Sequence, residues 1–389
     1  MSILRAAFAA LVGQSGVRRI FAAVSGAALM AFFLSCGGSG SSSANGPVAY
    51  VTLPADGSIL LLRLDPASGT LTSGGTTPVV PNTSPTGIAL LPSKKFLYAA
   101  NSRDNSISTF SVALDGTLAF ANTTPAQGSS PNGAAIDPSG QFLLVTNNLT
   151  DNISVFGISP STGALSLIGS PVGANANPTE IRFTHSGKFV YVTNPGIGTV
   201  TGFSFDASGG LLTQITTVVS GAGADALAVD ATNQYLYVAN VSASNPPPYT
   251  NITGNISGFS IDAGGGLTPL IGSPYIPTSG SSSGPSAIAV DPSGRFVYAV
   301  TAGSSASIWC FSITPADGEL VQVADSPFSL AGGGLFLLFE PTGSFFYSGS
   351  NSPVGINGYS YNTTSGQPTA ISGSPFSTGA VPGEMVISD

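Results

Sequence analysis

A repeated block of short β-type segments constrains what this chain can fold into. Each copy opens with a short apolar run that ends in an acidic or polar turn, and successive turns are 46, 47, 46, 61 and 49 residues apart. The turn residues are Leu91, Asp137, Thr184, Asp230, Asp291 and Glu340. A period in the forties, built from short strands and Gly/Pro turns, is typical of a β-propeller.

Each copy predicts four strands. The second strand carries a recurring tyrosine, and the third has an Ile or Val with an aromatic residue three positions later, as in Ile107 and Phe110. The fourth strand begins at a Leu after a Gly-rich turn, as at Leu118. The tyrosines are Tyr50, Tyr98, Tyr191, Tyr237, Tyr298 and Tyr347. Apolar β-type segments cut by Gly, Pro, Asn and Asp at this spacing indicate strands.

The two ends of the repeat region complete the count. The copy that begins at Pro47 lacks a first strand, and the segment Pro382–Asp389 supplies only a first strand. Six full copies and these two fragments predict an all-β, seven-bladed β-propeller over residues 47–389. The C-terminal strand would close the ring by joining the N-terminal blade, which removes exposed sheet edges.

The N-terminal segment is typical of an export signal. Arg5, Arg18 and Arg19 precede an apolar run, 20–34, that ends in Ser35-Cys36-Gly37. Positive residues, an apolar run and small residues describe a secretory signal. The cysteine resembles that of a bacterial lipoprotein signal, so residues 1–36 are expected to be a signal ending at a lipidated Cys36, with 37–46 as a flexible tether. An ordinary signal peptide or an uncleaved anchor is the alternative.

Charge limits the partners. Removal of the signal leaves seven basic against 18 acidic residues, a net charge of −11. Such a chain, without basic clusters, is not expected to bind nucleic acid, and only the lipid would hold it to the membrane. We expect a monomer in the cell envelope, outside the cytoplasm.

Counting also limits the chemistry. The one histidine, His185, falls in a predicted turn, so a Ser-His-Asp or Cys-His apparatus is not expected. Cys310 lies between Trp309 and Phe311 on a predicted strand and is expected to be a small buried residue. One histidine and one unlipidated cysteine cannot supply a usual zinc site, and no phosphate-binding Gly-rich motif is present. We therefore expect no metal and no cofactor.

One copy departs from the others where propellers line their central channel. The first strands mostly place Gly or Ala in two columns, but the third full copy has Glu180 and Arg182 there. Residues two apart on a strand share a face, and Glu384 falls in the same column as Glu180. These residues are candidates for a polar-ligand site, with Glu180 and Arg182 as catalytic base and electrostatic clamp. The alternative is an internal ion pair that fills space.

A second departure is an insertion of about fifteen residues, 241–255, between the second and third strands of the fourth full copy. Its centre, Pro246-Pro247-Pro248-Tyr249, is a candidate recognition loop with Tyr249 as a binding residue. The alternative is a tolerated surface insertion.

The repeat motif resembles a known family. The pattern Pro-x-Gly-Ile-Ala, then Asp-Pro-Ser-Gly-x-Phe-x-Tyr-Val-x-Asn, then Ile-x-x-Phe and Gly-x-Leu-Thr is similar to that of lactonase-type, YVTN-repeat seven-bladed propellers, which include 6-phosphogluconolactonase-like members. The resemblance implies a histidine after the repeat proline, with channel-facing Arg and Glu. Here those slots hold Thr86, Asn132, Thr179, Ser286 and Gly383. Only Glu180 and Arg182 match the charged set.

These observations lead to a functional expectation with one alternative. We expect a lipid-anchored, extracytoplasmic propeller that binds envelope proteins or glycans and is not an enzyme. The alternative is a lactone hydrolase with a channel site around Glu180 and Arg182.

Overall fold

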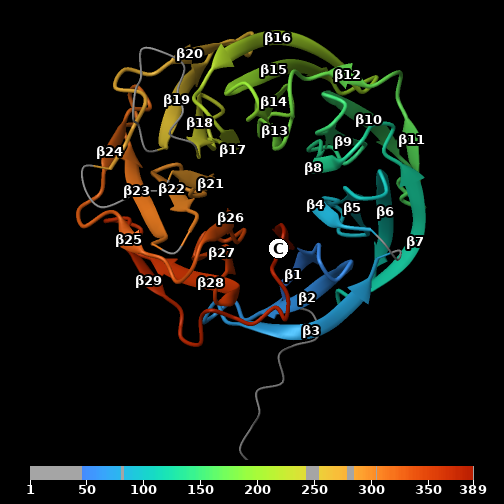
Figure 1. Cartoon of the computed structure of the whole chain (residues 1–389), viewed down its shortest axis with the longest axis horizontal. Helices are drawn as coiled ribbons and strands as arrows, with labels where there is room; N and C mark the ends of the chain where they lie inside the picture. The colour runs from blue at the N-terminus through green and yellow to red at the C-terminus, as the bar shows by residue number, and fades with distance from the viewer. Residues whose placement is uncertain (1–45, 80–82, 242–253, 278–283, 304, 389) are drawn as a thin grey trace, which may run out of the picture. The chain divides into compact units, whose positions relative to one another are not determined.

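The molecule is built from β-strands alone. The computed structural model describes residues 46–79, 83–241, 254–277, 284–303 and 305–388, which belong to one compact unit. Within these residues, 30 strands form seven antiparallel sheets. No helix occurs in the same residues. No helix long and apolar enough to span a membrane occurs in the described part of the chain. The sheets stand around a central axis as seven blades, which confirms the predicted fold (Figure 1).

Blades 1 to 4 follow one another along the chain, except that blade 1 takes its innermost strand from the C-terminus. Blade 1 consists of β30 (Met385–Ile387), β1 (Val48–Leu53), β2 (Ser58–Leu64) and β3 (Leu71–Pro78). Blade 2 consists of β4 (Pro85–Leu90), β5 (Phe96–Asn101), β6 (Ser106–Val112) and β7 (Leu118–Pro125). Blade 3 consists of β8 (Pro131–Ile136), β9 (Phe142–Asn147), β10 (Asn152–Ile158), β11 (Leu165–Leu167) and β12 (Val172–Gly173). Blade 4 consists of β13 (Ile181–Phe183), β14 (Phe189–Asn194), β15 (Thr199–Asp206) and β16 (Leu211–Val219).

Blades 5 to 7 complete the ring. Blade 5 consists of β17 (Ala224–Val229), β18 (Tyr235–Asn240), β19 (Asn255–Ile261) and β20 (Leu267–Pro269). Blade 6 consists of β21 (Pro285–Val290), β22 (Phe296–Thr301), β23 (Ser307–Ile313), β24 (Leu320–Gln322) and β25 (Phe328–Ser329). Blade 7 consists of β26 (Gly334–Phe339), β27 (Phe345–Asn351), β28 (Val354–Tyr361) and β29 (Pro368–Ala370).

The C-terminal strand closes the ring as the sequence predicts. Strand β30 pairs antiparallel with β1, with Tyr50 opposite Val386. The innermost strands contact one another in the order β30, β4, β8, β13, β17, β21 and β26, and β26 contacts β30 again. The first strand of every copy therefore lines the axis (Figure 1).

The hydrophobic core is divided among the blade interfaces. Each of seven clusters of buried apolar side chains combines residues of two neighbouring blades. In the cluster between blades 7 and 1, Phe336 and Ile356 pack with Leu62 and Met385. Because both faces of each sheet are covered by apolar contacts, the second strands are buried almost throughout rather than alternating with solvent.

The recurring tyrosine joins each blade to the next. Each of the six side chains is fully buried, and its hydroxyl donates to a carbonyl in the turn between the third and fourth strands of the following blade. These pairs are Tyr50–Gly116, Tyr98–Gly163, Tyr191–Gly265, Tyr237–Gly318, Tyr298–Gly366 and Tyr347–Gly69. Blade 3 has Leu144 at this position, so the blade 3–4 interface lacks the bond. The tyrosine column is thus an inter-blade hydrogen-bond series with one gap.

The acidic turn residue that marks the repeat holds the first hairpin of a blade together. The Oδ1 atom of Asp137 accepts hydrogen bonds from the backbone N–H groups of Gln141 and Phe142, at 2.8 and 2.7 Å. Asp230 and Asp291 accept the same pair of bonds in blades 5 and 6. The carboxylate satisfies backbone donors at the start of the second strand, which fixes where the innermost strand ends.

Candidate functional site

A cavity of about 290 Å³ lies where the seven innermost strands converge. One position in each blade faces it: the residue that follows the first residue of the repeat motif, which is proline in five copies and Ala224 or Gly334 in the others. These seven residues are Thr86, Asn132, Thr179, Asp225, Ser286, Leu335 and Gly383. The cavity is close to the lower end of the size range of small-molecule sites, about 300–1,000 Å³.

The hydroxyl groups of this ring are used to connect blades. Thr86 donates to the carbonyl of Pro131 in the next blade at 3.1 Å. Ser286 donates to the carbonyl of Gly334 at 2.7 Å, and Thr179 donates to that of Asp225 at 3.2 Å. Their role is therefore structural. By contrast, the side chains of Asn132 and Asp225 make no hydrogen bond with any residue in the described part of the chain, so both are free to contact a ligand.

The structure brings Glu180, Arg182 and Glu384 together, as the column pattern predicts. The Nε atom of Arg182 donates to Oε1 of Glu180 at 2.6 Å, and its Nη2 atom lies 2.5 Å from the same oxygen. A looser ion pair joins Nη2 to Oε1 of Glu384 at 3.8 Å. Oε2 of Glu384 also accepts a 2.9 Å hydrogen bond from the backbone N–H of Ile88 in β4. Glu384 belongs to the segment that closes the ring. Its carboxylate is therefore hydrogen-bonded to blade 2 through Ile88 and paired with blade 4 through Arg182.

This charged group remains open to the channel. The exposed fraction of the side chain is 45% for Arg182, 22% for Glu180 and 24% for Glu384. Arg182 has five N–H donors, and no described residue accepts a hydrogen bond from its Nη1. The guanidinium is consequently held in place on one side and able to bind a ligand oxygen on the other.

Two carboxyl groups of the cavity have raised pKa values. Burial raises the pKa of Asp225 to about 6, and the negative charge of Glu180 adds to the effect. Burial also raises the pKa of Glu384 to about 7; the charge of Glu180 adds to this, while Arg182 and the Ile88 N–H oppose it. A carboxylate with a pKa in this range is a stronger base than an ordinary one and still ionised in part at neutral pH.

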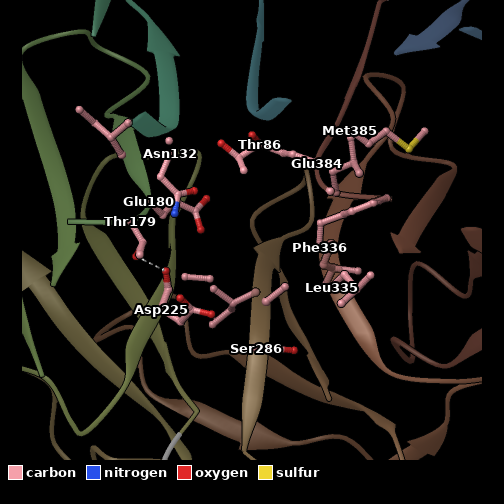
Figure 2. A pocket seen from close by; sticks show the side chains of 18 of the residues that line it. Thr86, Asn132, Thr179, Glu180, Asp225, Ser286, Leu335, Phe336, Glu384 and Met385 are labelled. Atoms are coloured by element: carbon pink, nitrogen blue, oxygen red, sulfur yellow. Dashed lines mark hydrogen bonds between the residues drawn. The ribbon is translucent and has the colours of Figure 1, made fainter. Parts of the chain in front are cut away.

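Apart from Glu384, the opposite side of the cavity is apolar (Figure 2). Leu335, Phe336, Leu337 and Leu338 of β26 line it together with Met385 of β30. Figure 2 shows Leu335, Phe336 and Met385 on one side of the opening, with Asn132, Glu180 and Asp225 across from them. We call Leu335, Phe336, Leu337, Leu338 and Met385 the apolar wall. At Leu335, Phe336 and Leu338, strand β26 places large apolar residues where most other blades place Gly, Ala or a polar side chain.

The other residues singled out in the sequence lie away from the cavity or outside the described residues. Cys36 and Tyr249 lie outside them, so the lipidation site and the recognition loop stay predictions. His185 is exposed in the turn after β13, and Cys310 is buried in β23, where burial raises the pKa of its thiol to about 12. No group of three or more possible metal ligands occurs in the parts of the chain described.

Comparison of the sequence with protein families identifies a family of seven-bladed propellers, in agreement with the fold. The family described as "Lactonase, 7-bladed beta-propeller" matches residues 40–178, 170–251 and 249–381. The chain belongs to the lactonase family of seven-bladed propellers. No curated protein matches the sequence.

Solved structures share the fold at low identity. A putative 6-phosphogluconolactonase from Bacteroides fragilis has a TM-score of 0.74 and 19% identity, over 90% of this chain and 99% of its own. A protein from Lactobacillus plantarum has a TM-score of 0.74 and 21% identity, over 88% of this chain and 99% of its own. The periplasmic gluconolactonase PpgL from Pseudomonas aeruginosa has a TM-score of 0.71 and 16% identity, over 88% and 99%.

Membership of this family bears on the choice between the two functions that the sequence predicts. From the sequence, we expect a binding or scaffold module, with a lactone hydrolase as the alternative. The family match favours the hydrolase. The seven residues of the ring include no histidine, and Asp225 is the one among them that can act as a base; the repeat pattern of the sequence does not mark it.

Proposed function

We propose that this lactonase-family propeller hydrolyses a lactone in its central cavity, with Asp225 as the general base. The observation that carries the proposal is a carboxylate that lines the cavity, makes no hydrogen bond with the described protein and has a pKa raised to about 6. Such a group can take a proton from water at neutral pH. The family match and the gluconolactonase-like neighbours support the choice of substrate class.

The reaction needs one water molecule and two proton transfers. Asp225 removes a proton from water as the oxygen attacks the lactone carbonyl carbon, and the carbonyl oxygen becomes an oxyanion. The Nη1 N–H groups of Arg182 stabilise that oxyanion. When the tetrahedral intermediate collapses, the bond from carbon to the ring oxygen breaks, and protonated Asp225 returns its proton to the leaving alkoxide. The product is an open-chain hydroxy acid.

Glu180 and Glu384 are positioning residues in this scheme. Glu180 binds Arg182 through two of its nitrogens, which fixes the guanidinium without using Nη1. Glu384 holds the same guanidinium more loosely from the opposite blade. Charge fixed in advance at the place where the oxyanion forms costs little reorganisation during the reaction, which is why such groups contribute strongly to catalysis.

The test is hydrolysis of a lactone panel by purified wild type and by Asp225→Asn. Loss of a general base lowers kcat by about 10²- to 10⁴-fold. Asp56→Asn, in the exposed turn between β1 and β2, is the matched control and should retain full activity. Equal activity in wild type and Asp225→Asn would contradict the assignment of the base, and a wild type inactive on every lactone would contradict the function.

We also infer that the reaction takes place outside the cytoplasm. The pattern of charges, apolar residues and Cys36 in residues 1–36 supports export with a lipid anchor. The similarity to a protein named as a periplasmic gluconolactonase is consistent with this location.

A further inference from the structure

We propose that the substrate is an uncharged lactone with an apolar substituent, and not a phosphorylated sugar lactone. This inference rests on the proposed function and narrows it. The ring of the lactone would lie beside Asp225 and Arg182, and the substituent would pack on the apolar wall. The charge balance of the cavity, the size of the side chains on β26 and a second adjoining cavity support it.

The charge balance disfavours an anion. The charged residues that line the main cavity are Glu180, Asp225 and Glu384 on the acidic side and Arg182 alone on the basic side. The guanidinium is already neutralised by Glu180 at 2.5 Å. A phosphate of about two negative charges would thus enter a main cavity in which three carboxyl groups surround a single guanidinium, and the carboxylates would repel it.

Within the apolar wall, Leu335, Phe336 and Leu338 are large apolar residues in columns where most other blades carry small or polar residues. At the position of Leu335 the other blades carry Thr, Asn, Asp, Ser or Gly, and at that of Leu338 most carry Ala. Leu335 and Leu338 are half-buried and line the cavity, so part of each side chain faces the cavity. A polyhydroxylated sugar would leave hydroxyl groups without partners on this side, whereas an alkyl group would remove apolar surface from water.

A second cavity extends the apolar wall. It has a volume of about 310 Å³ and shares Arg182, Leu338 and Met385 with the first, so the two cavities adjoin at these residues. Its lining adds Leu90, Phe339 and Ile387, and also Lys94; none of the described residues that line it is acidic. A linear chain that starts at a lactone ring beside Asp225 can therefore continue past Arg182 along apolar side chains.

The first experiment compares three substrates with the full chain. They are δ-decanolactone, glucono-δ-lactone and 6-phosphoglucono-δ-lactone. We expect kcat/KM for the alkyl lactone to exceed that for each sugar lactone by at least about tenfold, because each buried methylene contributes about 0.8 kcal/mol, or about fourfold. An equal or higher value for the phosphorylated lactone would overturn the substrate class and leave the hydrolase function standing.

The second experiment changes the wall. Leu335→Ser introduces the residue that blade 6 carries at the same position. The ratio of kcat/KM for the alkyl lactone to that for glucono-δ-lactone should fall about tenfold. Leu114→Ser, at a fully exposed leucine, is the control for the loss of a leucine and should not alter the ratio. An unchanged ratio in folded Leu335→Ser, checked by its melting temperature, would overturn the role of the wall.

A binding measurement separates the failure of this inference from the failure of the proposed function. Calorimetric titration with the lactam analogue of δ-decanolactone, which is not hydrolysed, and with gluconolactam reports the ligand preference without turnover. Preference for the alkyl lactam, lost in Leu335→Ser, supports the inference even if no lactone is hydrolysed. Equal binding of the two lactams by wild type would overturn it whether or not the protein is a hydrolase.

Discussion

The hydroxyl of Tyr347 donates a 2.7 Å hydrogen bond to the carbonyl of Gly69, 278 residues earlier in the chain. This bond joins blade 7 to blade 1 next to the sheet in which β30 pairs with β1. Five other tyrosines make the same bond to the following blade. The ring is thus fastened by side chain to backbone contacts as well as by its closing strand.

Tyr347→Phe should lower the free energy of unfolding by about 1–3 kcal/mol, because it leaves a buried carbonyl without its donor while keeping the ring in place. Urea denaturation followed by tryptophan fluorescence measures the change. The hydroxyl of Tyr235 makes no hydrogen bond with any residue in the described part of the chain, so Tyr235→Phe removes a hydroxyl without removing such a bond and is the matched comparison. A loss equal in both variants would show that the hydrogen bond contributes nothing.

Hydrolysis should increase with pH through about 6. Asp225 acts as a base only when ionised, and its pKa is raised to about 6. We therefore expect kcat/KM for the alkyl lactone to rise about tenfold between pH 5 and pH 7 and then to level off, after subtraction of the uncatalysed rate. Glu384→Gln should keep this rise, and Asp225→Asn should remove it. A profile that is flat across this range in wild type would contradict the choice of base.

The same two carboxyl groups should make the protein less stable as the pH rises. The pKa values of Asp225 and Glu384 are about 6 and 7 in the folded chain and lie near 4 in the unfolded chain, so the folded state binds these protons more tightly. Their contribution to stability is present below about pH 4 and is lost between about pH 4 and pH 7.

Thermal melting at pH 5 and at pH 8 measures this effect. The double variant Asp225→Asn/Glu384→Gln should show a smaller fall in melting temperature between the two pH values than wild type. The control variant is Asp56→Asn, which lies in an exposed turn and should melt as wild type does. An identical fall in wild type and the double variant would show that these groups do not carry the pH dependence.

Lipidation is tested by fatty-acid labelling of the full chain in a bacterial host. Cys36→Ser should abolish incorporation of an alkyne-tagged fatty acid, because the thiol is the attachment atom. Cys310→Ser is the matched control and should remain labelled, since Cys310 is buried in the fold. Labelling of the Cys36→Ser variant would contradict the predicted anchor.

The fold could be predicted from the sequence because the same residue types recur at the same position in each copy of the repeat. The tyrosine column, the acidic turn and the isolated final strand each have a defined place in a blade, so strand order and ring closure follow from them. The meeting of Arg182 with Glu384 was predictable for the same reason. Both occupy columns that face the axis, and few charged residues occur in those columns.

The remainder of the site escaped prediction for identifiable reasons. Asp225 follows Ala224 where most copies have proline, so the marker of its column was missing. The apolar wall on β26 contains no unusual residue type, and a run such as Leu335–Leu338 is what any buried strand displays. Its meaning depends on the empty space in front of it, which only the assembled ring defines.

Because Glu384 arrives immediately before β30, ring closure and completion of the ligand site are one event. A ribosome must release residues 382–388 before blade 1 gains its inner strand and before Arg182 meets its second carboxylate. A nascent or truncated chain is consequently an open ring with an incomplete site, so folding itself controls when the protein can first bind its ligand.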